Sequence, residues 1–205
     1  MDAKQLSSLI AKIKDDVMRE VNDRLPRTVG ITAVNLFRQN FRDAGYHDGT
    51  LKPWQKTRRQ LGKGTDARYT PLTSRRNHLM RSTSFTTQPG QVTVENPVPY
   101  ASIHNEGGDI STHPRITARL RRYAWHMVYS LAGVKGKGKL PKELPKEAEM
   151  WKGIALTKKH TLNIRAQIPK RQFMGDSKDL NQKINLLINQ SIERIKQSIA
   201  QLTAR

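Results

Sequence analysis

PYASIHNEGG, residues 99–108, is the stretch that decides the fold of this chain. It follows residues 91–95, where Val92 and Val94 alternate with polar residues as they do in a β-strand. Residues 84–87 and 91–95 are joined by a Pro-Gly turn and therefore predict a β-hairpin. The decisive stretch itself begins a further strand or a one-turn helix, which Gly107 and Gly108 end, with positive φ expected at this turn.

A second compact stretch, IPKRQFMG, occupies residues 168–175 and follows a strand-like run over residues 162–168. We expect Pro169 to set the chain direction and Phe173 to fill the core or a neighbouring subunit. We expect Arg171 to pair with a carboxylate.

Apolar residues at helical spacing predict helices at both ends of the chain. Residues 4–24 and 27–43 each carry one apolar stripe, and Pro26 lies between them, so they form either a helical hairpin or one kinked rod. Residues 178–203 carry the clearest stripe, with Asp176 or Ser177 as N-cap.

Two segments between these helices are less regular. Residues 45–70 are rich in glycine and basic residues and predict an irregular loop, which Trp54 anchors to the core. Residues 109–165 predict an inserted, extended arm that includes a helical stripe from Ile116 to Leu131. The expected fold is a single α+β domain over residues 1–205, with terminal helices packed on a small antiparallel sheet.

Composition restricts the function. Only 36% of the 205 residues are hydrophobic, so we expect parts of the chain to complete their burial against neighbours. With 37 Lys and Arg against 17 Asp and Glu, the formal net charge is +20, which predicts a salt-sensitive attraction to polyanions. The absence of cysteine excludes disulfides and thiolate metal sites.

No pattern typical of an enzyme is found. His104 and His113 are too far apart for a close metal-ligand pair, and no serine has a nucleophile-elbow setting. No phosphate-binding loop occurs, and no run of about 18 apolar residues predicts a membrane span. We therefore expect no catalysis, no metal, no cofactor and no membrane contact, and His104 is expected to make a structural hydrogen bond.

The two compact stretches, in this order, resemble the virion-morphogenesis or tail-completion proteins of tailed bacteriophages, including Mu-like tail-completion proteins. Those proteins carry a YAxIHxxGG segment, then IPxRxFxG, then a C-terminal helix. Residues 72–84 resemble the family's L…TGxLxxS segment, although Asn77 stands where the family often has glycine. Trp54 matches a tryptophan that follows the family's N-terminal helix.

The resemblance implies a structural protein of a phage or prophage that acts in tail completion or head–tail joining. It implies a homo-oligomeric ring, expected to be hexameric, that contacts the tail tube, the head connector or both, in the virion and, during assembly, in the host cytoplasm. The residues expected to carry this structural role are Trp54, Tyr100, Ile103, His104, Gly107, Gly108, Pro169, Arg171, Phe173 and Gly175.

The alternative is a protein that binds DNA or RNA without sequence specificity. It rests on charge, because no nucleic-acid-binding module is recognisable. In a ring, the same charges would suit non-specific contact with packaged DNA, since phosphate contacts carry no sequence information. The residues expected to face DNA are Lys56, Arg58, Arg59, Lys63, Lys135, Lys137 and Lys139.

Overall fold

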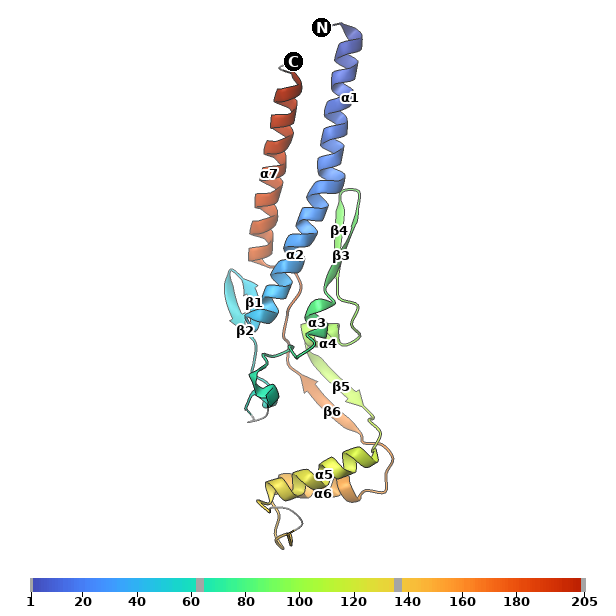
Figure 1. The fold of residues 1–205 in the computed structure, drawn as a ribbon, viewed down its shortest axis with the longest axis vertical. Coiled ribbons are helices and arrows are strands. Elements are labelled where there is room, and N and C mark those ends of the chain that lie inside the picture. Colours follow the sequence, from blue (N-terminus) through green and yellow to red (C-terminus); the bar gives the residue numbers. More distant parts are fainter. Residues whose placement is uncertain (1, 62–64, 135–137, 204–205) are drawn as a thin grey trace. The chain divides into compact units, whose positions relative to one another are not determined.

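The chain folds into two compact units (Figure 1). The structure, a computed structural model, describes residues 2–61, 65–134 and 138–203. The first unit contains residues 1–108 and 168–205, and the second contains residues 109–167, nearly the segment expected to be an inserted arm. Helices at both chain ends and small sheets between them confirm the predicted α+β class.

The first unit is built mainly from three long helical segments and two hairpins. Its helices are α1 (Ala3–Arg19), η1 (Glu20–Arg24), α2 (Leu25–Arg42), η2 (Arg58–Leu61), η3 (Thr65–Arg68), α3 (His78–Arg81), α4 (Ala101–Glu106) and α7 (Lys178–Thr203). Its strands are β1 (Gly45–Asp48), β2 (Thr50–Pro53), β3 (Ser84–Gln88) and β4 (Gln91–Glu95).

The two N-terminal helices form one continuous rod, so the hairpin alternative is wrong. They are joined by η1, a short π-helix in which the N–H of Leu25 bonds to the carbonyl of Glu20, five residues back. Pro26 lies in the first turn of α2, where its missing N–H is tolerated.

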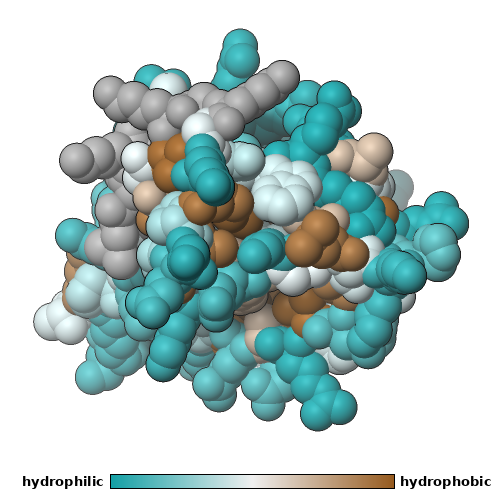
Figure 2. All heavy atoms as spheres, turned by 90° about the horizontal axis from the view of Figure 1, so that it is seen from below, coloured by the Kyte–Doolittle hydropathy of each residue, from teal (hydrophilic) through white to brown (hydrophobic). Residues whose placement is uncertain are grey.

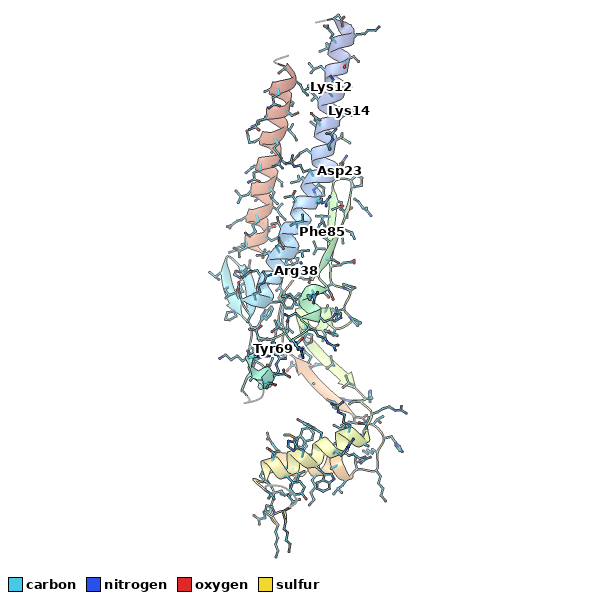
Figure 3. The ribbon with its side chains drawn as sticks, in the orientation of Figure 1. Lys12, Lys14, Asp23, Arg38, Tyr69 and Phe85 are labelled. Carbon is cyan, nitrogen blue, oxygen red and sulfur yellow. The ribbon has the colours of Figure 1, made fainter. Side chains whose placement is uncertain are left out.

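Helix α2 packs on the β3–β4 hairpin, which the Pro-Gly turn predicted. A Cβ at Gly30 would lie 2.3 Å from the ring of Phe85, so glycine at this point of the helix lets the strand approach (Figure 3). The Nη2 of Arg38 donates to the carbonyl of Thr83 at 3.0 Å and holds the chain directly before β3 begins.

The β1–β2 hairpin corrects the prediction of an irregular stretch over residues 45–70. Gly45 pairs with Pro53, and Gly49 takes φ 77 at the turn. Every residue of β2 is exposed, so this strand carries no alternation of apolar and polar residues that a sequence could reveal. Tyr46 on β1 is buried, and its hydroxyl donates to the carbonyl of Asp176 at 2.7 Å.

The strands form three separate two-stranded sheets, whereas the sequence predicted one. Two of them are the hairpins of the first unit. The third pairs β5 (Gly108–Thr112) with β6 (Ile164–Ile168), the run that alternation had predicted as a strand.

The second unit is more helical than the extended arm that the sequence predicted. Its helices are α5 (Ala118–Leu131) and α6 (Lys146–Leu156). They pack through buried Ala124, Val128, Ala148 and Ala155, small residues that allow close approach. The guanidinium of Arg121 donates to the carbonyl of Ala155 at 3.1 Å, which satisfies an otherwise free carbonyl at the end of α6.

Within the described ranges, no helix is long and apolar enough to cross a membrane. The same residues contain no group of three or more His, Cys, Asp or Glu side chains that could hold a metal ion.

Candidate assembly site

The two motif stretches, 60 residues apart in sequence, meet in the first unit. The N–H of Arg171 donates to the carbonyl of His104 at 2.8 Å. The side-chain oxygen of Asn105 accepts two backbone N–H bonds, from Phe173 at 2.9 Å and from Met174 at 3.0 Å. Helix α4 therefore holds the irregular segment 171–174 by contacts to its backbone, independent of most of that segment's side chains.

An aromatic cluster lies under this junction. Phe173 is 1% exposed and packs on Phe41, with ring centroids 4.9 Å apart, and Phe41 meets Trp54 edge-on at 5.7 Å. The indole N–H of Trp54 donates to the carbonyl of Gln172 at 2.9 Å. Buried Asn40 donates to the carbonyl of Phe173 at 3.0 Å. Trp54 thus anchors its loop to the core, as predicted, and also binds the second motif.

Gly107 and Gly108 form the turn after α4, and both take positive φ, whereas the sequence predicted it for one of the two. Gly107 has φ 75, and a Cβ there would lie 2.8 Å from the backbone nitrogen of Lys170. Gly108 has φ 135, and its Cβ would meet only the flexible end of Ile103, at 3.2 Å. Gly107 is therefore the position where glycine matters most, since backbone atoms cannot move aside as a side-chain end can.

The partner expected for Arg171 is wrong. Its Nε and Nη2 both donate to the backbone carbonyl of Gln55, each at 3.2 Å. Within the described part of the chain, no carboxylate lies within 4.0 Å of this guanidinium. Burial removes water from the charged group and lowers the pKa of Arg171. A neutral carbonyl holds the side chain in place but leaves its charge uncompensated.

The structural hydrogen bond expected from the imidazole of His104 is not formed with any described residue. Its Nδ1 is closed off from solvent and has no partner. Burial, and secondarily the charge of Arg171, lower the pKa of His104. The ring of Tyr100 meets the imidazole edge-on, with centroids 5.9 Å apart, while Tyr100 itself is 44% exposed. The imidazole thus contributes packing, and the backbone of His104 supplies the hydrogen bond.

The remaining motif residues surround the junction. Pro169 is half-buried directly before the bonded segment, and Gly175 takes φ 133 directly after it. A Cβ on Gly175 would lie 2.9 Å from the side-chain nitrogen of Gln172.

Asn77 stands at a turn where the family often has glycine. It takes φ 47 and ψ 38, the left-handed region that glycine enters freely and asparagine enters more readily than most residues. Its side chain accepts from the N–H of Ser74 at 3.0 Å, and its own N–H donates to the Ser74 hydroxyl at 3.2 Å. Asn77 therefore supplies a left-handed backbone conformation at this turn.

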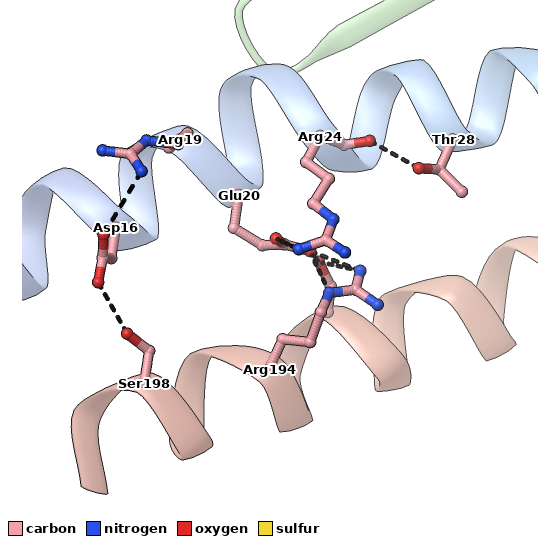
Figure 4. A network of polar contacts seen from close by, with 8 residues as sticks. Asp16, Arg19, Glu20, Arg24, Thr28, Arg194 and Ser198 are labelled. Carbon is pink, nitrogen blue, oxygen red and sulfur yellow. Dashed lines mark hydrogen bonds and ion pairs between the residues drawn. The ribbon is translucent and has the colours of Figure 1, made fainter. Parts of the chain in front are cut away.

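A second candidate surface is the pair formed by α1 and α7, which lie side by side (Figure 1). Glu20 is the buried polar centre of this pair (Figure 4). It accepts hydrogen bonds from the hydroxyl of Ser191 and from Nε of Arg194, the latter at 2.9 Å. Desolvation acts to raise the pKa of Glu20, but the bonds and charges of Arg194, Ser191 and Arg24 outweigh it and lower that pKa.

Part of the apolar surface of this pair is uncovered. Helix α1 has no buried residue, although it carries the apolar stripe that predicted it. A groove of about 240 Å³ between the two helices has a mixed lining: four apolar residues (Ile13, Val17, Ile195 and Ile199) and six charged or polar ones (Asp16, Arg19, Glu20, Arg24, Arg194 and Ser198). Beside it, large apolar side chains are 38–61% exposed: Leu6, Ile10, Met18, Val21, Leu186, Ile188 and Ile192. One copy of the chain cannot bury these side chains.

The residues expected to face DNA are divided between the two units and the part of the chain outside the described residues, so their common surface stays a prediction. Lys56 and Arg59 are exposed in the first unit, and Lys139 is exposed in the second. Lys63, Lys135 and Lys137 lie outside the described residues, as does the side chain of Arg58. The face shown in Figure 2 is mostly hydrophilic, with hydrophobic residues in separate spots.

Sequence reasoning missed three polar residues that organise these sites: Asn40, Asn105 and Glu20. Asn40 carried a usable signal, because it occupies a position of the apolar stripe of α2 where a polar side chain needs a buried partner. Asn105 lies within the decisive stretch itself. For Glu20, no local pattern distinguishes it from the exposed acidic residues of the same rod.

Comparison with known proteins yields one match. A family model described as the phage virion morphogenesis family matches residues 1–193, a range that includes both motif stretches and most of α7. No curated protein and no solved structure matches the chain.

Proposed function

Because the chain belongs to the phage virion morphogenesis family, we propose that it is a structural protein that completes the phage tail or joins the tail to the head, acting as a homo-oligomeric ring without catalysis. The family membership supports a role in virion assembly. The ring is supported by a single observation, which is the uncovered apolar surface of the α1–α7 pair.

That surface suits contact between copies of the same chain. Exposed apolar side chains on both helices gain about 25 cal/mol for each Å² that a neighbour removes from water. Charge opposes the contact only weakly, because residues 1–24 carry five Lys and Arg and five Asp and Glu, and residues 178–203 carry four Lys and Arg and two Asp and Glu, although the whole chain carries +20. Ring closure requires unlike patches of identical subunits to meet, and α1 and α7 present two different stripes.

The test measures mass in solution by size exclusion with light scattering. We expect a defined oligomer, with six copies as the specific expectation. Ile10→Gln, on a side chain 58% exposed, should lower the mass toward that of the protomer and leave the helical circular dichroism unchanged. Lys12→Gln, on the same helix, is the matched control and should leave the mass unchanged. A wild-type protein that stays monomeric at high concentration contradicts the ring.

The place in the virion is tested by electron microscopy of particles assembled without the protein. We expect free heads beside tails of abnormal length or abnormal end structure. Normal, complete particles would exclude a role in tail completion or head–tail joining.

Non-specific DNA binding is the second candidate, and the net charge of +20 favours it. It predicts that fluorescence anisotropy with two unrelated duplexes gives equal affinities that fall steeply as salt rises. A preference of about a hundredfold for one duplex at physiological salt would instead indicate specific readout. Binding that is equal and salt-sensitive is also compatible with a ring around packaged DNA.

A further inference from the structure

Arg171 is a buried cation without a counter-ion. It is 7% exposed, and the carbonyl of Gln55 is its only side-chain partner among the described residues. Burying a guanidinium without an opposite charge is unfavourable, which is why such groups are normally paired. Its Nη1 makes no hydrogen bond within the described chain, so part of the donor fork remains available.

The same side chain lines a pocket of about 340 Å³ in the first unit. Tyr100, His104 and Arg59 line it together with Arg171, and Leu79 contributes apolar wall. None of the described lining residues is acidic. The pocket therefore combines a recessed positive charge, further donors at its edge and an apolar wall.

The other groups that line the pocket do not neutralise its positive charge, because the cations are held by neutral carbonyl oxygens. Nη2 of Arg59 donates to the carbonyls of Thr70 and Thr73, at 3.0 and 3.1 Å. The imidazole of His104 has a buried nitrogen without a partner, beside the uncompensated charge of Arg171. An anion in the pocket would compensate the charge of Arg171.

We propose that this pocket, lined by Arg59, Tyr100, His104 and Arg171, binds the carboxylate of an acidic side chain from a neighbouring protein in the assembled particle. A carboxylate matches the planar guanidinium and can accept two parallel hydrogen bonds from it. The flexible methylene groups of an acidic side chain can carry its carboxylate past the edge of the pocket to Arg171. A DNA phosphate fits less well, because backbone phosphates are met by exposed cations and Arg171 is nearly closed off. The binding of a carboxylate in this pocket does not depend on the proposed function. Only the statement that a neighbouring protein in the particle supplies the carboxylate rests on it.

The binding test uses nuclear magnetic resonance of the full-length protein with labelled histidine, at constant ionic strength. His104 is assigned by comparison with His104→Gln. The probe is N-acetyl-glutamate N-methylamide, and N-acetyl-glutamine N-methylamide is its neutral control. We expect a saturable shift of the His104 signal with the glutamate compound and none with the glutamine compound. Equal shifts with both, or no shift with either, overturns the proposal.

Variants test whether the pocket's arginines bind the carboxylate, and inorganic phosphate tests whether the pocket prefers a different anion. Arg171→Gln should abolish the shift. If that variant does not fold, Arg59→Gln, on an exposed side chain, should weaken binding by about two- to fivefold, the range for one solvent-exposed charge. Lys56→Gln, an exposed cation outside the pocket lining, should leave binding unchanged, and an equal effect of both variants overturns the proposal. Inorganic phosphate that shifts His104 where the glutamate compound does not would assign the pocket to phosphate instead.

These experiments do not depend on ring formation. A monomeric protein that still shows the selective shift keeps the pocket and loses the ring. A protein that forms the ring but shows no selective shift keeps the ring and loses the pocket.

Discussion

The side-chain oxygen of Asn105 accepts a hydrogen bond from the backbone N–H of Phe173 at 2.9 Å, and this bond joins the two sequence motifs. The same oxygen also accepts from Met174. One side chain on α4 thereby fixes the segment that places an aromatic ring in the core. Three of the five predictions below concern this junction, one concerns the helix pair and one concerns the turn at Asn77.

Asn105→Ala should lower the free energy of unfolding by about 1–3 kcal/mol, because two backbone N–H groups lose their acceptor. Asn105→Asp should cost less, since a carboxylate keeps the acceptor and loses only the exposed bond to Glu106. Chemical denaturation measures both changes. Equal losses in the two variants would show that the acceptor oxygen is not the stabilising feature.

Phe173→Ala should lower the free energy of unfolding by about 3–5 kcal/mol, since it leaves a cavity between Phe41 and the residues around it. Phe173→Leu fills most of the space and should cost less. Thermal melting and particle mass are measured together. Unchanged melting and unchanged mass in Phe173→Ala would mean that this ring does not hold the core.

Gly107→Ala should destabilise the protein more than Gly108→Ala. Both positions have positive φ, but only at Gly107 does the new Cβ collide with backbone, the nitrogen of Lys170. Strain of this kind costs about 1–3 kcal/mol. The comparison of melting temperatures for the two variants tests the order, and a larger loss at Gly108 would reverse it.

Glu20→Gln should lower the free energy of unfolding by about 1.5–3 kcal/mol at neutral pH, because the hydrogen bonds from Arg194 and Ser191 lose the negative charge of their acceptor. The folded-state pKa of Glu20 lies below its ordinary value of 4.5. Its stabilisation is therefore present above pH 4.5 and is lost as pH falls through the folded-state pKa. The difference between wild type and variant should shrink over that acidic range.

The control for this pH dependence is Asp15→Asn, on an exposed residue of the same rod. It should change the unfolding free energy little at any pH. A wild-type-to-Glu20→Gln difference that stays constant from neutral pH to strong acid would contradict the depressed pKa.

Asn77→Gly should keep the stability of the protein close to wild type, whereas Asn77→Val should lower it. The left-handed backbone at this position is open to glycine and strained for a β-branched residue. Glycine loses the side-chain bond to the N–H of Ser74, so a small decrease is expected. Equal stability of the glycine and valine variants, measured by thermal melting, would show that the backbone conformation is not limiting.

Periodicity predicted the elements in which buried side chains recur at a regular spacing along the sequence. Residues 178–203 were predicted as a helix and form α7 over those residues, with the Ser177 hydroxyl accepting from the N–H of Leu180 as an N-cap. The β3–β4 hairpin follows from the Pro-Gly turn and alternation. The β1–β2 hairpin escaped prediction because β2 buries no face.

The sequence by itself determined the terminal helices, the β3–β4 hairpin, the glycine turn at 107–108 and the family, because each is written in neighbouring residues or in a short motif. Only the tertiary structure decided that Asn40 would bond to Phe173, 133 residues away, and that Arg171 would lie against a carbonyl and not a carboxylate. A hydrogen bond between distant residues leaves no periodic trace. Its partner is set by how the rod, α4 and the second motif pack together.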